Sequence, residues 1–134
     1  MQQTIPIYQH TLSNGLKIAA SPRNNSQTAC FSIGYKVGSK DEPLNKTGFA
    51  HLFEHLMFDG STNVPRGEFD KLVSNVGGQC NAYTSYDQTV YHEHMPADSI
   101  ELAMWLEADR MHQFGVKEIG LETQKKVVLE EISQ

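Results

Sequence analysis

The sequence predicts an α+β fold in which helices flank a largely antiparallel sheet. Two observations indicate this class. Short stretches of strand-forming residues come in pairs around tight turns, and longer amphipathic stretches between them have helical spacing. The chain has 134 residues, of which 39% are hydrophobic and 20% charged, as is typical of a globular domain. Because it has no repeat and no low-complexity linker, we expect residues 1–134 to form one domain.

The first half of the chain is expected to begin with a hairpin. Asn14-Gly15 is a typical tight-turn pair, so strands are predicted near 5–12 and 16–21, followed by a longer strand near 27–37. A helix is predicted at about 47–58. Four of its apolar residues fall on one side of the helix and are expected to face the core: Phe49, Leu52, Phe53 and Leu56.

The second half is expected to contain a further hairpin between helices. Pro65-Arg66-Gly67 predicts the start of a helix near 67–76, and Gly77-Gly78 its end. Strands near 79–85 and 88–94 form the hairpin, which Pro96 closes. A long amphipathic helix is predicted over 97–112, and the final helix begins near 119–121.

The segment His51-Leu52-Phe53-Glu54-His55 carries the clearest chemical signal. At about 100° per residue, its two imidazoles and its carboxylate project from one arc of the helix roughly 100° wide. Polar groups beside an apolar face are costly to bury unless they are paired or bind a metal. The pattern therefore predicts a hydrolytic metal site, with a solvated surface of an amphipathic helix as the alternative.

A catalytic zinc site needs a third protein ligand and one open position, and the C-terminal helix offers two adjacent acids. Val127 and Val128 lie one turn before Glu131 and bracket its direction, whereas Glu130 points about 100° away. Glu131 is therefore the inward candidate. The alternative is a solvated acidic helix end.

The HxxEH order, followed much later by Glu131, resembles the inverzincins of the pitrilysin and mitochondrial processing peptidase family. Further landmarks occur in family order from about residue 7 to the C-terminus, so the resemblance covers nearly the whole chain. It implies the N-terminal part of that family's metallopeptidase domain. The landmarks are Ser13-Asn14-Gly15-Leu16, the helix at 48–58, the segment 77–84, Thr89-Val90-Tyr91 and the helical segment 106–111.

The resemblance implies a zinc-dependent endopeptidase that hydrolyses unfolded peptides or presequences. His51, His55 and Glu131 would hold one Zn²⁺ per chain, and Glu54 would be the general base acting on a zinc-bound water. Asn81 and Ala82 lie in a segment that resembles the family strand receiving an extended peptide through backbone hydrogen bonds. From the residues alone, an ordinary core strand is the favoured interpretation of that segment.

Two departures from the family pattern stand out. Family peptidases resemble two similar halves, each larger than this chain, so we expect a truncated domain that pairs with a second half-domain or self-associates. The alternative function is a noncatalytic peptide-binding or partner-subunit domain that is inactive in isolation. In addition, Gln124 stands where many relatives carry a second acid that supports the site.

Charge and composition exclude other classes of protein. The net charge is −5, and residues 68–134 carry 12 acidic and 5 basic groups, which argues against nucleic-acid binding. No apolar run approaches the roughly 20 residues of a membrane span. The N-terminus has no readable export signal, so a soluble protein of the cytoplasm or periplasm is expected.

Two smaller features are open to different interpretations. His92 and His94 alternate along a predicted strand and could share one face, as a rival metal pair or as a polar strand end. Cys30 and Cys80 form no CxxC pair and are expected to be small buried residues.

Overall fold

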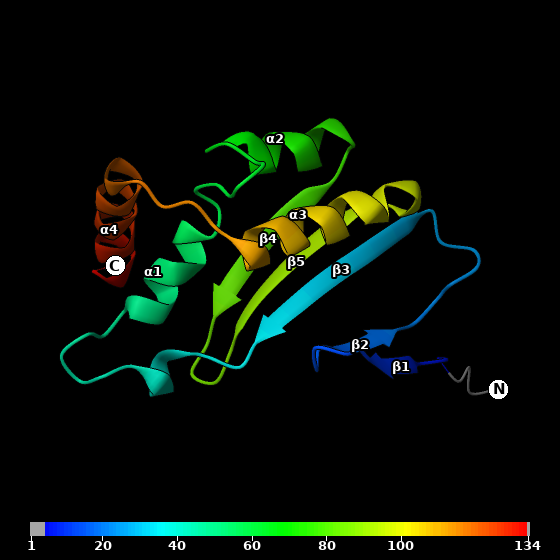
Figure 1. Ribbon diagram of the computed structural model, residues 1–134, viewed down its shortest axis with the longest axis horizontal. Coiled ribbons are helices and arrows are strands. Elements are labelled where there is room, and N and C mark those ends of the chain that lie inside the picture. The colour runs from blue at the N-terminus through cyan, green and yellow to red at the C-terminus, as the bar shows by residue number, and fades with distance from the viewer. Residues whose placement is uncertain (1–4, 134) are drawn as a thin grey trace.

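Figure 1 shows the computed structural model, which describes residues 5–133. The α+β class is confirmed, and the predicted strands and helices are present with ends shifted by a few residues. The strands are β1 (Tyr8–Thr11), β2 (Lys17–Ala20), β3 (Thr28–Tyr35), β4 (Gln79–Thr84) and β5 (Thr89–Pro96). The helices are α1 (Phe49–Leu56), α2 (Glu68–Asn75), α3 (Ile100–His112) and α4 (Glu118–Ile132), with short 3₁₀ turns η1 (Ser39–Asp41) and η2 (Ala97–Ser99).

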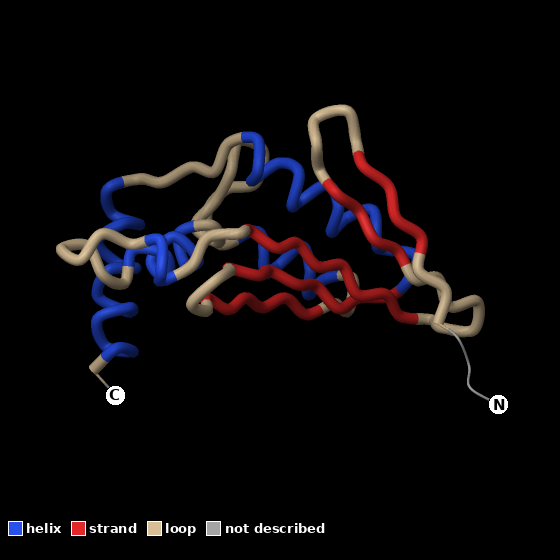
Figure 2. Tube along the Cα trace, turned by 90° about the horizontal axis from the view of Figure 1, so that it is seen from below, coloured by secondary structure: helices blue, strands red, loops and turns tan. Residues whose placement is uncertain are grey.

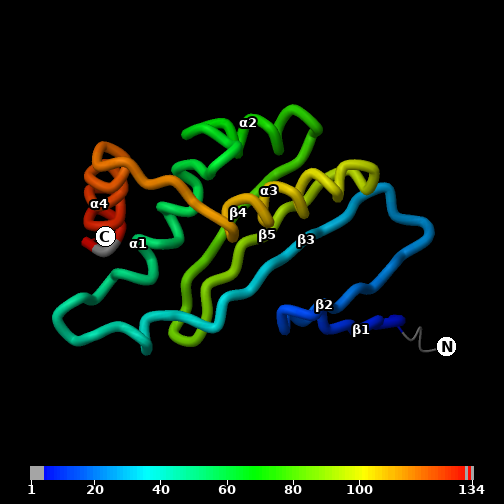
Figure 3. Tube along the Cα trace, viewed as in Figure 1, coloured from blue at the N-terminus to red at the C-terminus, as the bar shows by residue number. Residues whose placement is uncertain are grey.

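The main sheet has three antiparallel strands in the order β3-β5-β4. β1 and β2 form a separate antiparallel hairpin, which lies at the opposite end of the molecule from α4 (Figures 1 and 3). β5 extends through Pro96, further than predicted, because Pro96 still pairs with Thr28. The first residues of the predicted helix at 97–112 form the η2 turn.

The larger part of the core lies between the sheet and two helices. Phe69 and Val73 of α2, Ala103 and Leu106 of α3 and Met95 of β5 form one buried cluster. α2 and α3 therefore cover the same face of the sheet, and Figure 2 shows the three strands as a layer with helices across it.

A buried charged cluster lies beside this core. The Arg110 guanidinium pairs with Glu107 and lies 3.7 Å from Glu93, and it also lies 4.2 Å from the centre of the Tyr91 ring. Both Glu93 carboxylate oxygens are buried, and neither has a hydrogen-bond partner among the described residues. Burial, together with the nearby Glu107 carboxyl, raises the pKa of Glu93 to about 9.

The second, smaller core joins α1 to α4. Leu52 and Leu56 pack against Val128, with Leu121 at the edge of the contact. The prediction that all four apolar residues of α1 face the core was wrong for Phe49 and Phe53, which are exposed to 46% and 42%. The two phenylalanines contact each other instead, because α4 covers only the narrower stripe that carries the leucines.

The opposite face of the sheet is polar and open. The Cys30 side chain is exposed, so its predicted burial was wrong, and Cys80 is partly buried. Cys30 occupies a strand position whose side chain points away from α2 and α3. Within residues 5–133, no helix is long and apolar enough to cross a membrane.

Candidate metal centre

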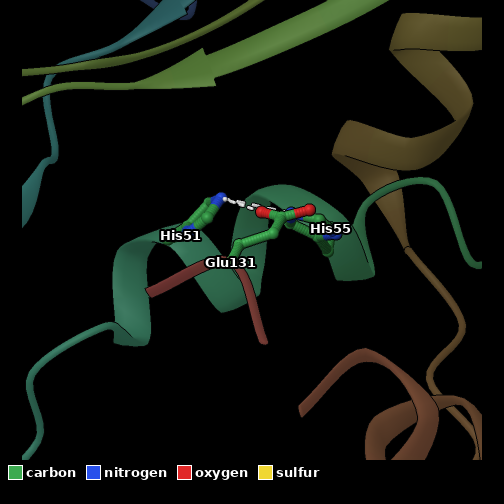
Figure 4. A group of neighbouring side chains, drawn as sticks. All are labelled: His51, His55 and Glu131. Atoms are coloured by element: carbon green, nitrogen blue, oxygen red, sulfur yellow. Dashed lines mark hydrogen bonds and ion pairs between the residues drawn. The ribbon is translucent and has the colours of Figure 1, made fainter. Parts of the chain in front are cut away.

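The predicted metal ligands come together at the junction of α1 and α4. His51 and His55 lie one turn apart on α1, with their Nε2 atoms 3.2 Å from each other. A Glu131 carboxylate oxygen from α4 lies 3.3 Å from Nε2 of His51 and 3.5 Å from Nε2 of His55. Figure 4 shows the Glu131 carboxylate directed at the two rings, with 47% of its side chain exposed. The neighbouring Glu130 is also exposed and is not part of this cluster.

The spacing of these three donor atoms suits a tetrahedral ion. Zinc binds imidazole nitrogen and carboxylate oxygen at about 2.0–2.1 Å, so tetrahedral geometry requires donors roughly 3.3 Å apart. The observed separations of 3.2, 3.3 and 3.5 Å match this requirement. In the part of the chain that the structure describes, these three residues form the only cluster of histidine, cysteine and acidic side chains compact enough to hold a metal.

A neighbouring amide orients one of the rings. Nδ1 of His55 lies 3.3 Å from Oε1 of Gln124, one helical repeat before Glu131 on α4. With the amide oxygen as acceptor, Nδ1 would be the donor, and that tautomer leaves the lone pair of Nε2 for a metal. The group beside His55 is thus the neutral amide of Gln124, at the position where the sequence comparison with the family pattern expected an acid.

The first turn of α1 is held by a distant acid. The N-cap residue Gly48 has a φ of +86° and no side chain to cap the helix. The Glu42 carboxylate replaces the missing cap by accepting the N–H groups of Gly48 at 2.9 Å and Ala50 at 2.7 Å. It thereby satisfies backbone donors next to His51.

Glu54 lies on the side of α1 opposite the leucines that contact α4. It is buried, with 8% of its surface exposed. The Thr84 hydroxyl, on β4, donates to its carboxylate at 2.5 Å. Thr84 also lies 3.4 Å from the Thr89 hydroxyl, which donates to the Val37 carbonyl. The Glu54 carboxylate is thus fixed by β4, outside the triangle of metal donors.

All six sequence-predicted site residues line one cleft of about 700 Å³: His51, Glu54, His55, Asn81, Ala82 and Glu131. β4 forms one wall of this cleft and is an edge strand, since β5 pairs with one side of it and no described strand pairs with the other. The Asn81 side chain accepts the N–H of Ala82 at 2.8 Å. The Ala82 N–H therefore lies in the wall of the cleft, and its hydrogen-bond partner is the exposed Asn81 side chain.

The rival histidine pair shares a face of β5 but does not complete a site. The rings of His92 and His94 lie 5.6 Å apart, and Nε2 of His94 is 3.9 Å from the Cys30 sulfur. Among residues 5–133, no third group converges with them into a compact cluster. Within these residues, the pair therefore lacks the third donor that a metal site needs.

Sequence reasoning missed two residues of the site, Glu42 and Thr84. Glu42 lies six residues before the helix cap that it supplies, outside any local capping pattern. Thr84 is part of the strand segment quoted in the family resemblance, but its contact with Glu54 depends on how α1 packs against β4. Strand alternation alone would place Thr84 on the same face as Ala82.

Comparison with known proteins shows the family to which the chain is related. The family described as insulinase, peptidase family M16, matches residues 17–134. The zinc protease PqqE of Helicobacter pylori is 38% identical over 123 residues, covering 90% of this chain and 28% of that protein. A probable mitochondrial-processing peptidase subunit beta of Schizosaccharomyces pombe is 34% identical over 121 residues, covering 90% of this chain and 26% of that protein.

Solved structures show the same fold. A protease from Helicobacter pylori superposes with a TM-score of 0.91 at 36% identity, covering 95% of this chain and 31% of that one. Pitrilysin superposes with a TM-score of 0.89 at 21% identity, covering 98% of this chain and 14% of that one, a likeness of fold alone. The chain thus spans less than a third of the length of each of these proteins.

Proposed function

This chain belongs to the insulinase family of peptidases, family M16, and we propose that it carries the metal centre of a zinc-dependent endopeptidase acting on unfolded peptides. The observation that carries the proposal is the triangle of donors from His51, His55 and Glu131, with separations that suit tetrahedral zinc. A buried carboxylate, Glu54, lies on the same helix outside this triangle. Such a set corresponds to three ligands and one base.

In the proposed chemistry, the three ligands hold the metal and Glu54 transfers the proton. A zinc ion in the triangle would supply a Lewis acid that polarises the peptide carbonyl and lowers the pKa of water. Glu54 takes the proton from the attacking water and passes it to the departing amine. Thr84 donates to one Glu54 oxygen and so directs the carboxylate, while the low exposure of Glu54 limits competing solvent.

The substrate is proposed to bind as an added strand along β4. The edge of β4 faces the cleft beside the metal donors. An extended peptide would take the Ala82 N–H from the Asn81 side chain and continue the sheet by backbone pairing. Because backbone pairing is tolerant of sequence, this arrangement suits cleavage of varied unfolded peptides or presequences.

We propose that a second half-domain closes the cleft. The chain spans 28% of the length of the zinc protease PqqE, and one solved neighbour is described as the first half of the periplasmic protease PqqL of Escherichia coli. On this reading, residues 1–134 are the metal-bearing part of one peptidase domain. Self-association through the open sheet edges is the other way to cover this surface.

The test compares the unsubstituted chain with Glu54→Gln, using Glu130→Gln on the exposed face of α4 as the control. Zinc content and cleavage of an unstructured peptide library are measured for each, alone and in a longer form that includes the rest of the domain. We expect Glu54→Gln to keep zinc but lose cleavage by at least about a hundredfold, and the control to keep both.

Each outcome discriminates between functions. Retained turnover in Glu54→Gln would refute its role as the base. Zinc binding without turnover in every form would favour the alternative, a noncatalytic peptide-binding or partner-subunit domain. Failure of every form to bind zinc would refute the metal centre itself.

A further inference from the structure

A close approach between two helices lies at the end of α1 remote from His51. Asp59 follows α1, and its carboxylate lies against Gly120 in the first turn of α4. A Cβ added at position 120 would lie 2.7 Å from Cγ of Asp59 and 3.0 Å from its Oδ1, and closer still to Oδ2. Only glycine fits this contact without displacement.

Asp59 is held in place from the other side. Its side chain is buried, with 4% of the residue exposed, and its Oδ1 lies 2.7 Å from Nε of Arg66. A carboxylate beside the first turn of a helix is also favoured by the helix dipole. Moving this side chain away would separate it from Arg66 and from the helix end, so Asp59 resists displacement.

The loop after α1 is itself anchored to the rest of the fold. The Asp109 carboxylate of α3 accepts hydrogen bonds from the Ser61 hydroxyl at 2.5 Å and from the Asn63 backbone at 3.1 Å. Gly115, shortly before α4, donates to the Gly60 carbonyl at 2.8 Å. The loop that carries Asp59 and the segment that leads into α4 are thus joined.

The two metal-bearing helices run antiparallel between this contact and the metal donors. Asp59 meets Gly120 at one end, and His51 meets Glu131 at the other. Between these ends the helices share the Leu52, Leu56 and Val128 contact. A shift of α4 at position 120 would therefore displace the same helix that carries Glu131.

We infer that the Asp59–Gly120 contact fixes the position of α4 relative to α1 and thereby places Glu131, the third metal ligand. The inference rests on the proposed zinc site. Ordinary carbon contacts begin at about 3.4 Å, so an alanine at 120 must move by roughly 0.7 Å from Cγ alone. Metal–ligand distances tolerate only about 0.2 Å.

The choice of residue is consistent with this role. Glycine is the poorest helix former apart from proline, yet it occupies the first turn of α4 with a φ outside the left-handed region. Backbone conformation therefore does not demand glycine at position 120. The close approach of Asp59 does.

The test is a cycle of Gly120→Ala, Asp59→Ala and the double variant, with Gly115→Ala as the matched control. A Cβ at Gly115 would have no neighbour nearer than 4.0 Å. Zinc dissociation constants are measured by competition with a chromophoric chelator, and the absorption bands of the Co²⁺-loaded chain report ligand geometry. Circular dichroism establishes that each variant is folded.

We expect Gly120→Ala to weaken zinc binding by roughly tenfold or more and to change the Co²⁺ spectrum, while Gly115→Ala does neither. In the Asp59→Ala background, the added methyl group has room, so the double variant should bind zinc within about threefold of Asp59→Ala alone. This rescue separates positioning from a general loss of stability.

The failures are distinguishable. If the unsubstituted chain binds zinc and Gly120→Ala binds it equally well, the positioning role is overturned and the proposed function stands. A loss in Gly120→Ala that Asp59→Ala does not relieve also overturns the positioning role. If the unsubstituted chain binds no zinc, the proposed function fails and this inference fails with it.

Discussion

The contact between His55 and Gln124 gives the sharpest prediction about metal affinity. Gln124→Leu keeps the approximate size of the side chain but removes the acceptor that lies 3.3 Å from Nδ1 of His55. The ring then loses the group that fixes its tautomer and its orientation. Nε2 of His55 is free to take the proton, which a metal must displace.

The size of the effect follows from the kind of hydrogen bond. A neutral hydrogen bond contributes about 1 kcal/mol net, and one to a charged group about 1.5–3 kcal/mol. Metal binding places positive charge on the imidazole, so the lost free energy of binding should lie nearer the roughly 1.5–3 kcal/mol of a charged hydrogen bond. At about 1.4 kcal/mol per factor of ten, zinc affinity should fall by roughly 10- to 100-fold, the range seen for such supporting groups.

The assay is competition for zinc with a chromophoric chelator, with Lys126→Leu on the exposed side of α4 as the control. Gln124→Glu supplies the opposite change, because a carboxylate acceptor makes the imidazole a stronger donor to the metal. We expect the affinities to rank Gln124→Glu, the unsubstituted chain, then Gln124→Leu. Equal affinity for the chain and Gln124→Leu within twofold would refute this reasoning.

Two further predictions concern stability. Glu42→Ala removes the carboxylate that caps α1, so urea unfolding should show a loss of about 1–2 kcal/mol; an unchanged midpoint would mean that the cap contributes nothing. Glu93→Gln tests the raised pKa of a buried carboxyl. Above about pH 4.5 the unfolded chain releases the Glu93 proton, whereas the folded chain keeps it until about pH 9. The contribution of Glu93 to the free energy of unfolding is therefore largest below about pH 4.5 and is lost as the pH rises to about 9. The free energy of unfolding measured across this window should decline less steeply in Glu93→Gln, and an identical slope would contradict the assignment.

Local sequence patterns were sufficient for the elements and for the direction of Glu131. Helical spacing placed Glu131 on the side marked by Val127 and Val128, and Val128 does pack against α1. Strand alternation and the turn at Asn14-Gly15 predicted the hairpins. These features depend on residues close in sequence, whose relative directions the backbone geometry sets.

Contacts between distant segments were beyond the sequence patterns. The cap from Glu42 joins a loop residue to the start of α1, and the Thr84–Glu54 hydrogen bond joins β4 to α1. The exposure of Phe49 and Phe53 has the same origin, because periodicity identifies an apolar side but not how much of it a neighbouring helix covers. The width of the α4 contact decided that, and it is a property of packing.

The proposed peptide-binding strand and the proposed base are mechanically linked. Ala82 and Thr84 lie two residues apart on β4, so their side chains share a face of the strand, and Thr84 holds the Glu54 carboxylate. A peptide that pairs with the edge at Ala82 is therefore fixed to the same rigid element that orients Glu54. Because β4 is paired with β5 along its whole length, the distance between a bound peptide backbone and the base cannot drift independently of the sheet. We expect Thr84→Val to lower cleavage while leaving peptide binding intact, since it removes the orientation of the base but not the edge.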